Sequence, residues 1–196
     1  MRSLSHALVV LALAASGALA QAPGASKLPP EPAPTPLPAE FSDEARRAYA
    51  AGLKESRELL AQKRYDAAIA RLETLSRERP REPQARFLKA VAESEAGKPD
   101  AAMATLTALV ADFPELPEVH NNLAVLHAAR GNLDLARTEL ELAIAASPEY
   151  APAVENLGDV YARLAARQYE RAIVLEKSKG NAPAKLKLVR DALAVR

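Results

Sequence analysis

The feature that most constrains this chain is the recurrence of residue types at intervals of 34 positions. Three sets of residues share this interval: Pro80, Pro114 and Pro148; Ala68, Ala102 and Ala136; and Leu72, Leu106 and Leu140. A period of this length is the sequence signature of a repeat protein, in which one supersecondary unit stacks on the next. Because each unit contacts mainly its neighbours, such a chain is expected to form an elongated solenoid with a continuous core.

Each 34-residue unit is predicted to contain two helices joined by a tight turn. In the third unit, apolar residues over 118–130 recur close to the helical period. Gly131 and Asn132 follow, and both residue types tolerate the left-handed backbone that ends a helix. A second helix is expected over 133–146, ended by Pro148. Aromatic residues make up only 4% of the chain and there is no Trp, so a core of small and aliphatic side chains favours packed helices over sheets.

This arrangement resembles the tetratricopeptide repeat, whose 34-residue unit has Leu-Gly, an aromatic residue, Gly, Ala and Pro at set offsets. The best local match is the run Asn156-Leu157-Gly158-Asp159-Val160-Tyr161, and the resemblance covers about residues 49–176. It implies an all-α, right-handed superhelix of stacked helical hairpins, with units at about 49–82, 83–116 and 117–150. The residues expected to pack between helices are Ala68, Ala102, Leu123, Ala124, Ala136, Leu157, Gly158 and Tyr161.

The fourth unit, at about 151–177, departs from the pattern. Ala165, Tyr169 and Ala172 have the spacing of the second helix's Ala, aromatic and Ala. Counted from Gly158, however, they lie five residues earlier in the sequence than in a regular unit. The usual turn is therefore missing. The sequence predicts either one long helix from about Pro152 to Lys177 or a much tightened corner. A last helix is expected at 183–195, packed over the open end, because the exposed ends of a solenoid need caps.

The N-terminus has the pattern of a secretory signal. Arg2 supplies the positive charge, Leu8 to Ala15 is a short apolar run, and Ala18-Leu19-Ala20 is a small-x-small cleavage pattern. We expect cleavage after Ala20, with cleavage after Ala22 as the alternative. Residues 21–39 hold seven of the fifteen prolines, which predicts a disordered or polyproline-II-like linker. The chain is thus similar to exported bacterial members of the family, and we expect it to be periplasmic or secreted.

Composition and motifs point away from catalysis and from nucleic acids. Lys and Arg number 26 against 25 Asp and Glu, without the basic excess typical of a nucleic-acid binder. The absence of Cys excludes thiol catalysis, disulfides and Cys-ligated zinc. His120 and His127 lie two helical turns apart, about 10 Å by helix rise, which is too far for two ligands of one metal, so we expect both to pack in the core or an interface. We predict no catalytic residue, no metal site and no cofactor.

The resemblance implies that the first helices of the units line a concave groove. Carried over by position, the groove residues include Leu53, Arg57, Gln84, Phe87, Val91, Ser94, Asn121, Val125, Glu155 and Asp159. Such a surface, apolar in its middle and polar at its ends, suits an extended segment or helix of another protein.

The expected function is therefore a non-enzymatic protein–protein interaction module or scaffold of the bacterial cell envelope, with envelope proteins as partners. The alternative is an envelope tether or self-associating element. It would use the proline-rich linker and the basic C-terminal helix with Lys185, Lys187 and Arg190, which suits weak contact with anionic lipid or an acidic partner. The two alternatives leave the oligomeric state open.

Overall fold

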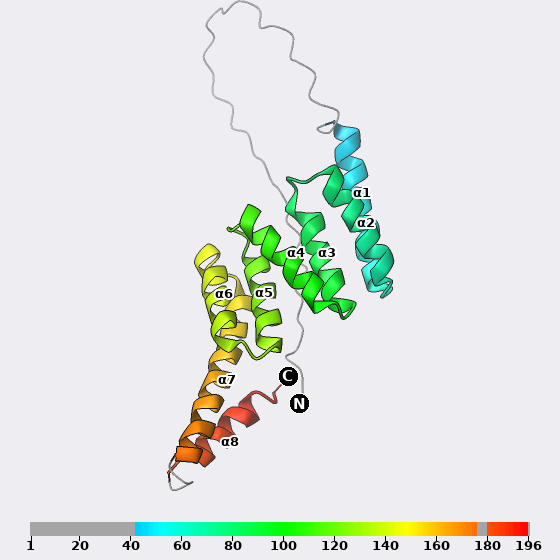
Figure 1. Cartoon of the computed structure of the whole chain (residues 1–196). Coiled ribbons are helices and arrows are strands. Elements are labelled where there is room, and N and C mark those ends of the chain that lie inside the picture. Colours follow the sequence, from blue (N-terminus) through cyan, green and yellow to red (C-terminus); the bar gives the residue numbers. More distant parts are fainter. Residues whose placement is uncertain (1–41, 176–179, 196) are drawn as a thin grey trace, which may run out of the picture.

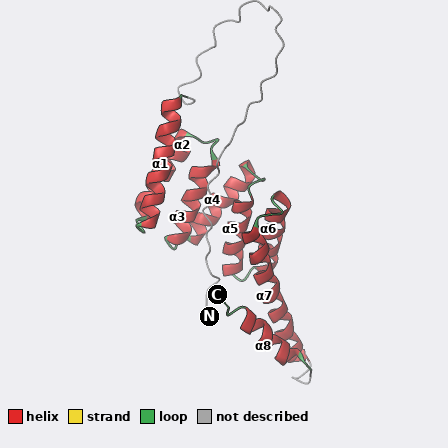
Figure 2. Cartoon of the chain, turned by 180° about the vertical axis from the view of Figure 1, so that it is seen from behind, coloured by secondary structure: helices red, strands yellow, loops and turns green. Residues whose placement is uncertain are grey.

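A computed structural model describes residues 42–175 and 180–195. The expected signal sequence and proline-rich linker fall within residues 1–41, which lie outside the described residues, as do 176–179 and 196. Every regular element in the described ranges is an α-helix (Figures 1 and 2). The helices are α1 (Asp43–Ala61), α2 (Tyr65–Glu78), α3 (Pro83–Glu95), α4 (Pro99–Asp112), α5 (Pro117–Ala129), α6 (Leu133–Ala146), α7 (Ala151–Leu175) and α8 (Ala182–Ala192).

The first six helices form three hairpins, α1–α2, α3–α4 and α5–α6, which follow one another along the molecule (Figure 1). Each helix packs against the helix before it and the helix after it in the sequence. The turns inside the hairpins have a left-handed residue at equivalent positions: Lys63 with φ 57°, Gly97 with φ 72° and Gly131 with φ 79°. Glycine adopts this conformation at no steric cost, so two of the three turns use the residue best suited to end a helix.

The residues that carry the 34-residue period form the core between the helices. The periodic alanines are 0% exposed: Ala68, Ala102 and Ala136. The periodic leucines are at most 2% exposed: Leu72, Leu106 and Leu140. Leu123 and Ala124 are also buried. Small residues at these crossings let neighbouring helices approach closely, which is why the period is so regular.

The fourth unit is one continuous helix, so the fused-helix alternative describes it. α7 runs for 25 residues from Ala151 to Leu175, and α8 returns along its C-terminal half (Figure 1). Arg190 Nη2 lies 2.7 Å from Glu170 Oε1, and Lys185 Nζ lies 5.9 Å from the centre of the Tyr169 ring. The last helix therefore packs mainly against the extension of α7 rather than over the α5–α6 hairpin, because the unbroken helix carries its attachment point beyond that hairpin.

The continuous helix also changes the surroundings of residues expected to pack between helices. Leu157 is half-buried against the core of α5 and α6. Gly158, however, is exposed, and within the described ranges no atom of another element lies within 4 Å of where its Cβ would be. Tyr161 is 48% exposed. The predictions for Gly158 and Tyr161 are wrong because the second helix that would cover them does not fold back.

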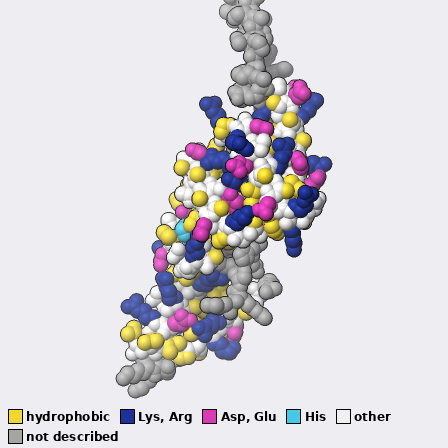
Figure 3. All heavy atoms as spheres, turned by 45° about the vertical axis from the view of Figure 1, so that its right-hand side comes forward, with side chains coloured by type: hydrophobic (Ala, Val, Ile, Leu, Met, Phe, Trp, Pro, Cys, Tyr) yellow, Lys and Arg dark blue, Asp and Glu magenta, His cyan; other side chains and the backbone are white. Residues whose placement is uncertain are grey.

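The surface is polar and mixed in charge. On the face shown in Figure 3, basic and acidic side chains are interspersed. One pair bridges neighbouring hairpins, with Lys98 Nζ 2.7 Å from Asp66 Oδ1, and another joins the two helices of the second hairpin, with Arg86 Nη1 2.6 Å from Asp112 Oδ2. Exposed pairs of this kind contribute at most about 1 kcal/mol each. Within the described ranges, no helix combines the length and the apolar character that crossing a membrane requires.

Candidate partner-binding groove

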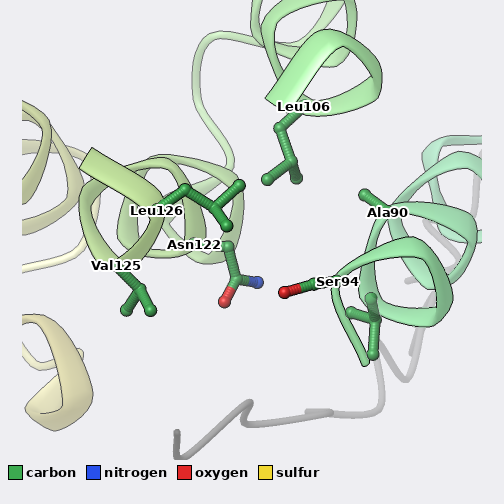
Figure 4. A pocket seen from close by; sticks show the side chains of 7 residues that line it. Ala90, Ser94, Leu106, Asn122, Val125 and Leu126 are labelled. Atoms are coloured by element: carbon green, nitrogen blue, oxygen red, sulfur yellow. The ribbon is translucent and has the colours of Figure 1, made fainter. Parts of the chain in front are cut away.

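A pocket lies where the first helices of the second and third hairpins separate. α1 contacts α3, and α5 contacts α7, but α3 and α5 approach each other less closely and are joined chiefly through α4. The pocket between them has a volume of about 250 Å³, counting space open to solvent. Its lining residues are Ala90, Val91, Ser94, Leu106, Asn122, Val125 and Leu126 (Figure 4).

Equivalent residues differ between the α3–α5 pair and the α5–α7 pair. Asn156 of α7 donates a hydrogen bond from Nδ2 to Oδ1 of Asn121 on α5, over 2.8 Å, and this bond ties α7 to α5. Thirty-four residues earlier, the same two positions hold Asn122 on α5 and Phe87 on α3. Phenylalanine has no side-chain acceptor. Asn122 therefore cannot repeat the bond, and α5 is not tied to α3 in this way.

The side-chain amide of Asn122 makes no hydrogen bond within the described fold. The residue is only 6% exposed, and its side chain makes no hydrogen bond to any residue that the structure describes. Its amide is not among the side-chain groups that are both enclosed and unbonded, because it faces the pocket, which is open to solvent. In Figure 4 the Asn122 amide and the Ser94 hydroxyl point into the same space between α5 and α3. The pocket thus offers apolar walls beside two groups that donate and accept hydrogen bonds.

A row of equivalent residues gives the groove opposite charges at its two ends. Val91 and Val125 line the pocket, and the residues one repeat before and one repeat after them are Arg57 and Asp159. Arg57 is exposed on α1, and Asp159 is half-buried on α7. Neither forms an ion pair with another described residue. Along the first helices, the row therefore changes from basic through apolar to acidic.

A second row of equivalent residues faces the neighbouring first helix instead of the groove, and here two predictions are wrong. Leu53 is 5% exposed and belongs to the core of the first hairpins. Asn121 is 1% exposed and bonded to Asn156. Phe87, in the same row, is half-buried against the core around Leu106. The last member, Glu155, is exposed. Of the remaining predicted groove residues, Gln84 is half-buried on α3.

Four residues of the pocket wall were not expected from the sequence: Ala90, Leu106, Asn122 and Leu126. The repetition of Asn122-Leu123 as Asn156-Leu157 is visible in the sequence. It signals that these asparagines occupy equivalent positions, but that Asn122 has no hydrogen-bond partner follows only from the structure, where Asn121 and not Asn122 bonds to the next first helix.

The histidines have a structural setting. His120 is 4% exposed, with Nδ1 2.8 Å from Glu139 Oε2 and Nε2 3.0 Å from the carbonyl oxygen of Pro114. It thereby joins α5 to α6 and to the preceding loop. His127 is half-buried. No cluster of three or more side chains able to hold a metal ion occurs in the described part of the chain.

Stacked helical hairpins whose first helices share one side define an α-helical repeat protein of the superhelical type. A sequence profile described as "Tetratricopeptide repeat" matches residues 59–126 and 94–164, which together span more than half of the chain. The chain belongs to the tetratricopeptide repeat family.

Solved structures share this fold at low sequence identity. The first TPR domain of human RPAP3 is 18% identical, with 61% of this chain and 94% of that chain covered and a TM-score of 0.57. The thermophilic TPR protein TTC0263 of Thermus thermophilus is 25% identical, with coverages of 74% and 83% and a TM-score of 0.55. The Yersinia enterocolitica type III secretion chaperone SycD, solved with a peptide of the translocator YopD, is 14% identical, with coverages of 64% and 98% and a TM-score of 0.55. No match to a curated protein sequence was found.

Proposed function

We propose that this protein is a non-enzymatic interaction module that binds an extended segment of another protein along α1, α3, α5 and α7. The observation that carries the proposal is the amide of Asn122, which has no hydrogen-bond partner among the described residues and faces a largely apolar pocket. An extended segment presents one N–H and one carbonyl per residue, so its backbone can bond to Asn122 while an apolar side chain enters the pocket. The SycD structure, which holds a peptide of another protein, supports this use of the fold.

The charges of the groove favour one kind of segment. Arg57 lies on one side of the pocket residues Val91 and Val125, and Asp159 lies on the other. A segment with an apolar anchor, acidic residues toward α1 and basic residues toward α7 matches both ends. Charge complementarity of this kind fixes the direction of a bound segment and speeds association.

Replacing Asn122 with leucine tests the proposal. We expect Asn122→Leu to weaken binding of a peptide selected on the wild-type protein from a random library by about tenfold or more, equal to about 1.4 kcal/mol. The fold should persist, because leucine occupies the equivalent position in the second unit as Leu88, which is 2% exposed. Binding is measured by isothermal titration calorimetry, and helicity by circular dichroism.

The control is Leu142→Ala, a change at a 46% exposed residue of α6 that does not line the pocket. It should leave affinity unchanged. Equal affinities of wild type and Asn122→Leu, or selected peptides without an apolar anchor between charges, would contradict the proposal.

We further propose that the protein acts in the periplasm, or after secretion, as a scaffold for envelope proteins. The support is the N-terminal pattern of Arg2, the apolar run from Leu8 to Ala15 and the small residues Ala18 and Ala20. N-terminal sequencing of the protein from fractionated bacteria should find Gln21 as the first residue, in the periplasm or the medium. An intact N-terminus in the cytosolic fraction would contradict it.

The tether alternative has weaker support, because the basic groups of α8 are engaged within the fold. Arg190 pairs with Glu170, Lys187 Nζ lies 2.6 Å from Asp191 Oδ2, and Lys185 lies over the Tyr169 ring. Such contacts favour a role of α8 in holding the end of α7. Lys177, Lys179 and Arg196, the other basic residues of the tail, lie outside the described residues.

A further inference from the structure

The groove lies within reach of a segment of this chain that precedes α1. Residues 21–41 lie outside the described ranges and join the helical domain at Ser42, whose side chain caps the first turn of α1. Arg57, which marks the level of the pocket on α1, lies about 21 Å further along this helix. Packed helices are about 8–10 Å apart, so the pocket between α3 and α5 lies about 15 Å to the side of Arg57. A segment that enters the groove from Ser42 therefore follows a path of about 35 Å, along α1 and then across α3.

Leu28 is the large apolar residue of this segment whose reach matches that path. The others are Leu37 and Phe41, which lie closer to Ser42. A proline-rich segment tends to extend by about 3.1 Å per residue, so the fourteen residues from Leu28 to Ser42 span about 43 Å. The five residues from Leu37 span at most about 18 Å even when fully extended. Leu28 can therefore reach the pocket, and Leu37 cannot.

The charges beside Leu28 follow the order of the charges in the groove. The shortest path from Ser42 runs from α1 toward α7, so Glu31 comes to the α1 side of Leu28 and Lys27 to its α7 side. Glu31 is then directed toward Arg57, about 9 Å from Leu28, which is close to one helix spacing. Lys27 is directed toward Asp159. This order places opposite charges together at both ends of the groove.

The backbone at Leu28 also suits the polar groups of the pocket. Pro29 and Pro30 follow it and have no N–H group, whereas Leu28 has both an N–H and a carbonyl group. The side-chain amide of Asn122 can donate to one and accept from the other, and it points into the pocket together with the Ser94 hydroxyl (Figure 4). Prolines restrict the unbound segment as well, so it loses less conformational entropy on binding than a flexible segment does.

We propose that residues 27–31 of this chain occupy its own groove when no partner is bound, with Leu28 in the pocket, Glu31 toward Arg57 and Lys27 toward Asp159. The segment is then a tethered competitor of the partner, an inference that rests on the proposed function of the groove. A tether of this kind gives an effective concentration in the millimolar range. Even a weak contact, with an intrinsic Kd of about 0.1 mM, would therefore reduce the affinity for a partner about tenfold.

Paired cysteines test the position of the segment without any partner, because the chain has no Cys of its own. In the full chain, Leu28→Cys combined with Ser94→Cys should form an intrachain disulfide in high yield on mild oxidation, since the two Cβ atoms must come within about 4.5 Å. The matched control is Ala25→Cys with Ser94→Cys. Its tether is slightly longer, but residue 25 would lie about 9 Å beyond the pocket, so its yield should be severalfold lower. Equal yields, or a disulfide that links two chains, would overturn the proposal.

Leu28→Ser tests competition with a partner. It should bind the peptide selected on the wild-type protein about tenfold more tightly, as measured by isothermal titration calorimetry on the full chain. Leu37→Ser makes the same substitution in the same segment but out of reach of the pocket, and it should leave the affinity unchanged. Measurable but equal affinities of wild type and Leu28→Ser would contradict the competition.

The two experiments distinguish this inference from the proposed function. A high disulfide yield in a protein that binds no selected peptide would support the contact of the segment with the groove and contradict the proposed function. Peptide binding that Leu28→Ser does not change, together with equal disulfide yields, would leave the proposed function standing and overturn the contact.

Discussion

Replacing Leu140 with alanine should lower the free energy of unfolding by about 2–5 kcal/mol, the range for a large-to-small change in a closed core. Leu140 is 0% exposed and lies in the cluster shared by α5, α6 and α7. Its neighbours there include Ala124, Ala136 and Ala143, which hold the helices close but are too short to fill the space that leucine leaves. The cavity should therefore persist, and the loss should fall in the upper part of the range.

Leu142→Ala is the control for this change. It makes the same substitution two residues further along the same helix, at a side chain that is 46% exposed. Since helix propensity changes equally in both variants, the difference between their urea denaturation curves isolates burial. We expect Leu142→Ala to change stability by less than about 1 kcal/mol. Similar losses in the two variants would mean that the faces of α6 are assigned wrongly.

The hairpins could be predicted from the sequence because the period and the core coincide. Ala68, Ala102 and Ala136 recur every 34 residues, and each is the place where two helices cross with no room for a larger side chain. The turns at Gly97 and Gly131 repeat for a separate reason, since both need a positive φ. Two independent physical demands with one period leave few alternatives to stacked helical hairpins.

The path of the chain in the fourth unit could not be predicted from the sequence. The shortened spacing before Ala165 and Tyr169 indicates that a turn is missing, but a continuous helix and a tight corner both satisfy that spacing. The choice decides whether Gly158 and Tyr161 are covered, and a repeat pattern carries no information about it. In the structure the helix continues, so these two residues are exposed.

The groove was predictable along one row of residues and not along the next. Arg57, Val91, Val125 and Asp159 follow from the repeat offset, and the row passes through the pocket. Leu53 and Asn121 lie about one turn away on their helices, yet they are buried. A first helix in a solenoid has neighbours on several sides and only a narrow open sector, and helical periodicity alone does not locate the edges of that sector.

A fall in stability at alkaline pH should follow from Tyr150, which is 8% exposed in the core shared by α6 and α7. Burial and, as the smaller cause, the nearby negative charge of Glu118 together raise the pKa of this phenol from 10 to about 12. Between these values the unfolded chain loses the proton while the folded chain keeps it. The contribution of Tyr150 is therefore complete below pH 10 and is lost as the pH rises toward 12. The free energy of unfolding lost from this source is about 1.4 kcal/mol at pH 11, and the complete loss is on the order of 2–3 kcal/mol.

Tyr150→Phe should remove this dependence, because phenylalanine fills the same space without an ionisable group. Urea denaturation of both proteins from pH 8 to above pH 11 should give curves that run parallel below pH 10 and then diverge, with the wild type losing more stability. Burial also raises the pKa of Tyr49, but that tyrosine is present in both proteins and cancels in the difference. Tyr161→Phe, at an exposed tyrosine of α7, is the control and should follow the wild type. Curves for Tyr150→Phe and wild type that stay parallel above pH 10 would show that the Tyr150 hydroxyl reaches water in the folded protein, and the packing of α7 on α6 would then be looser than the structure has it.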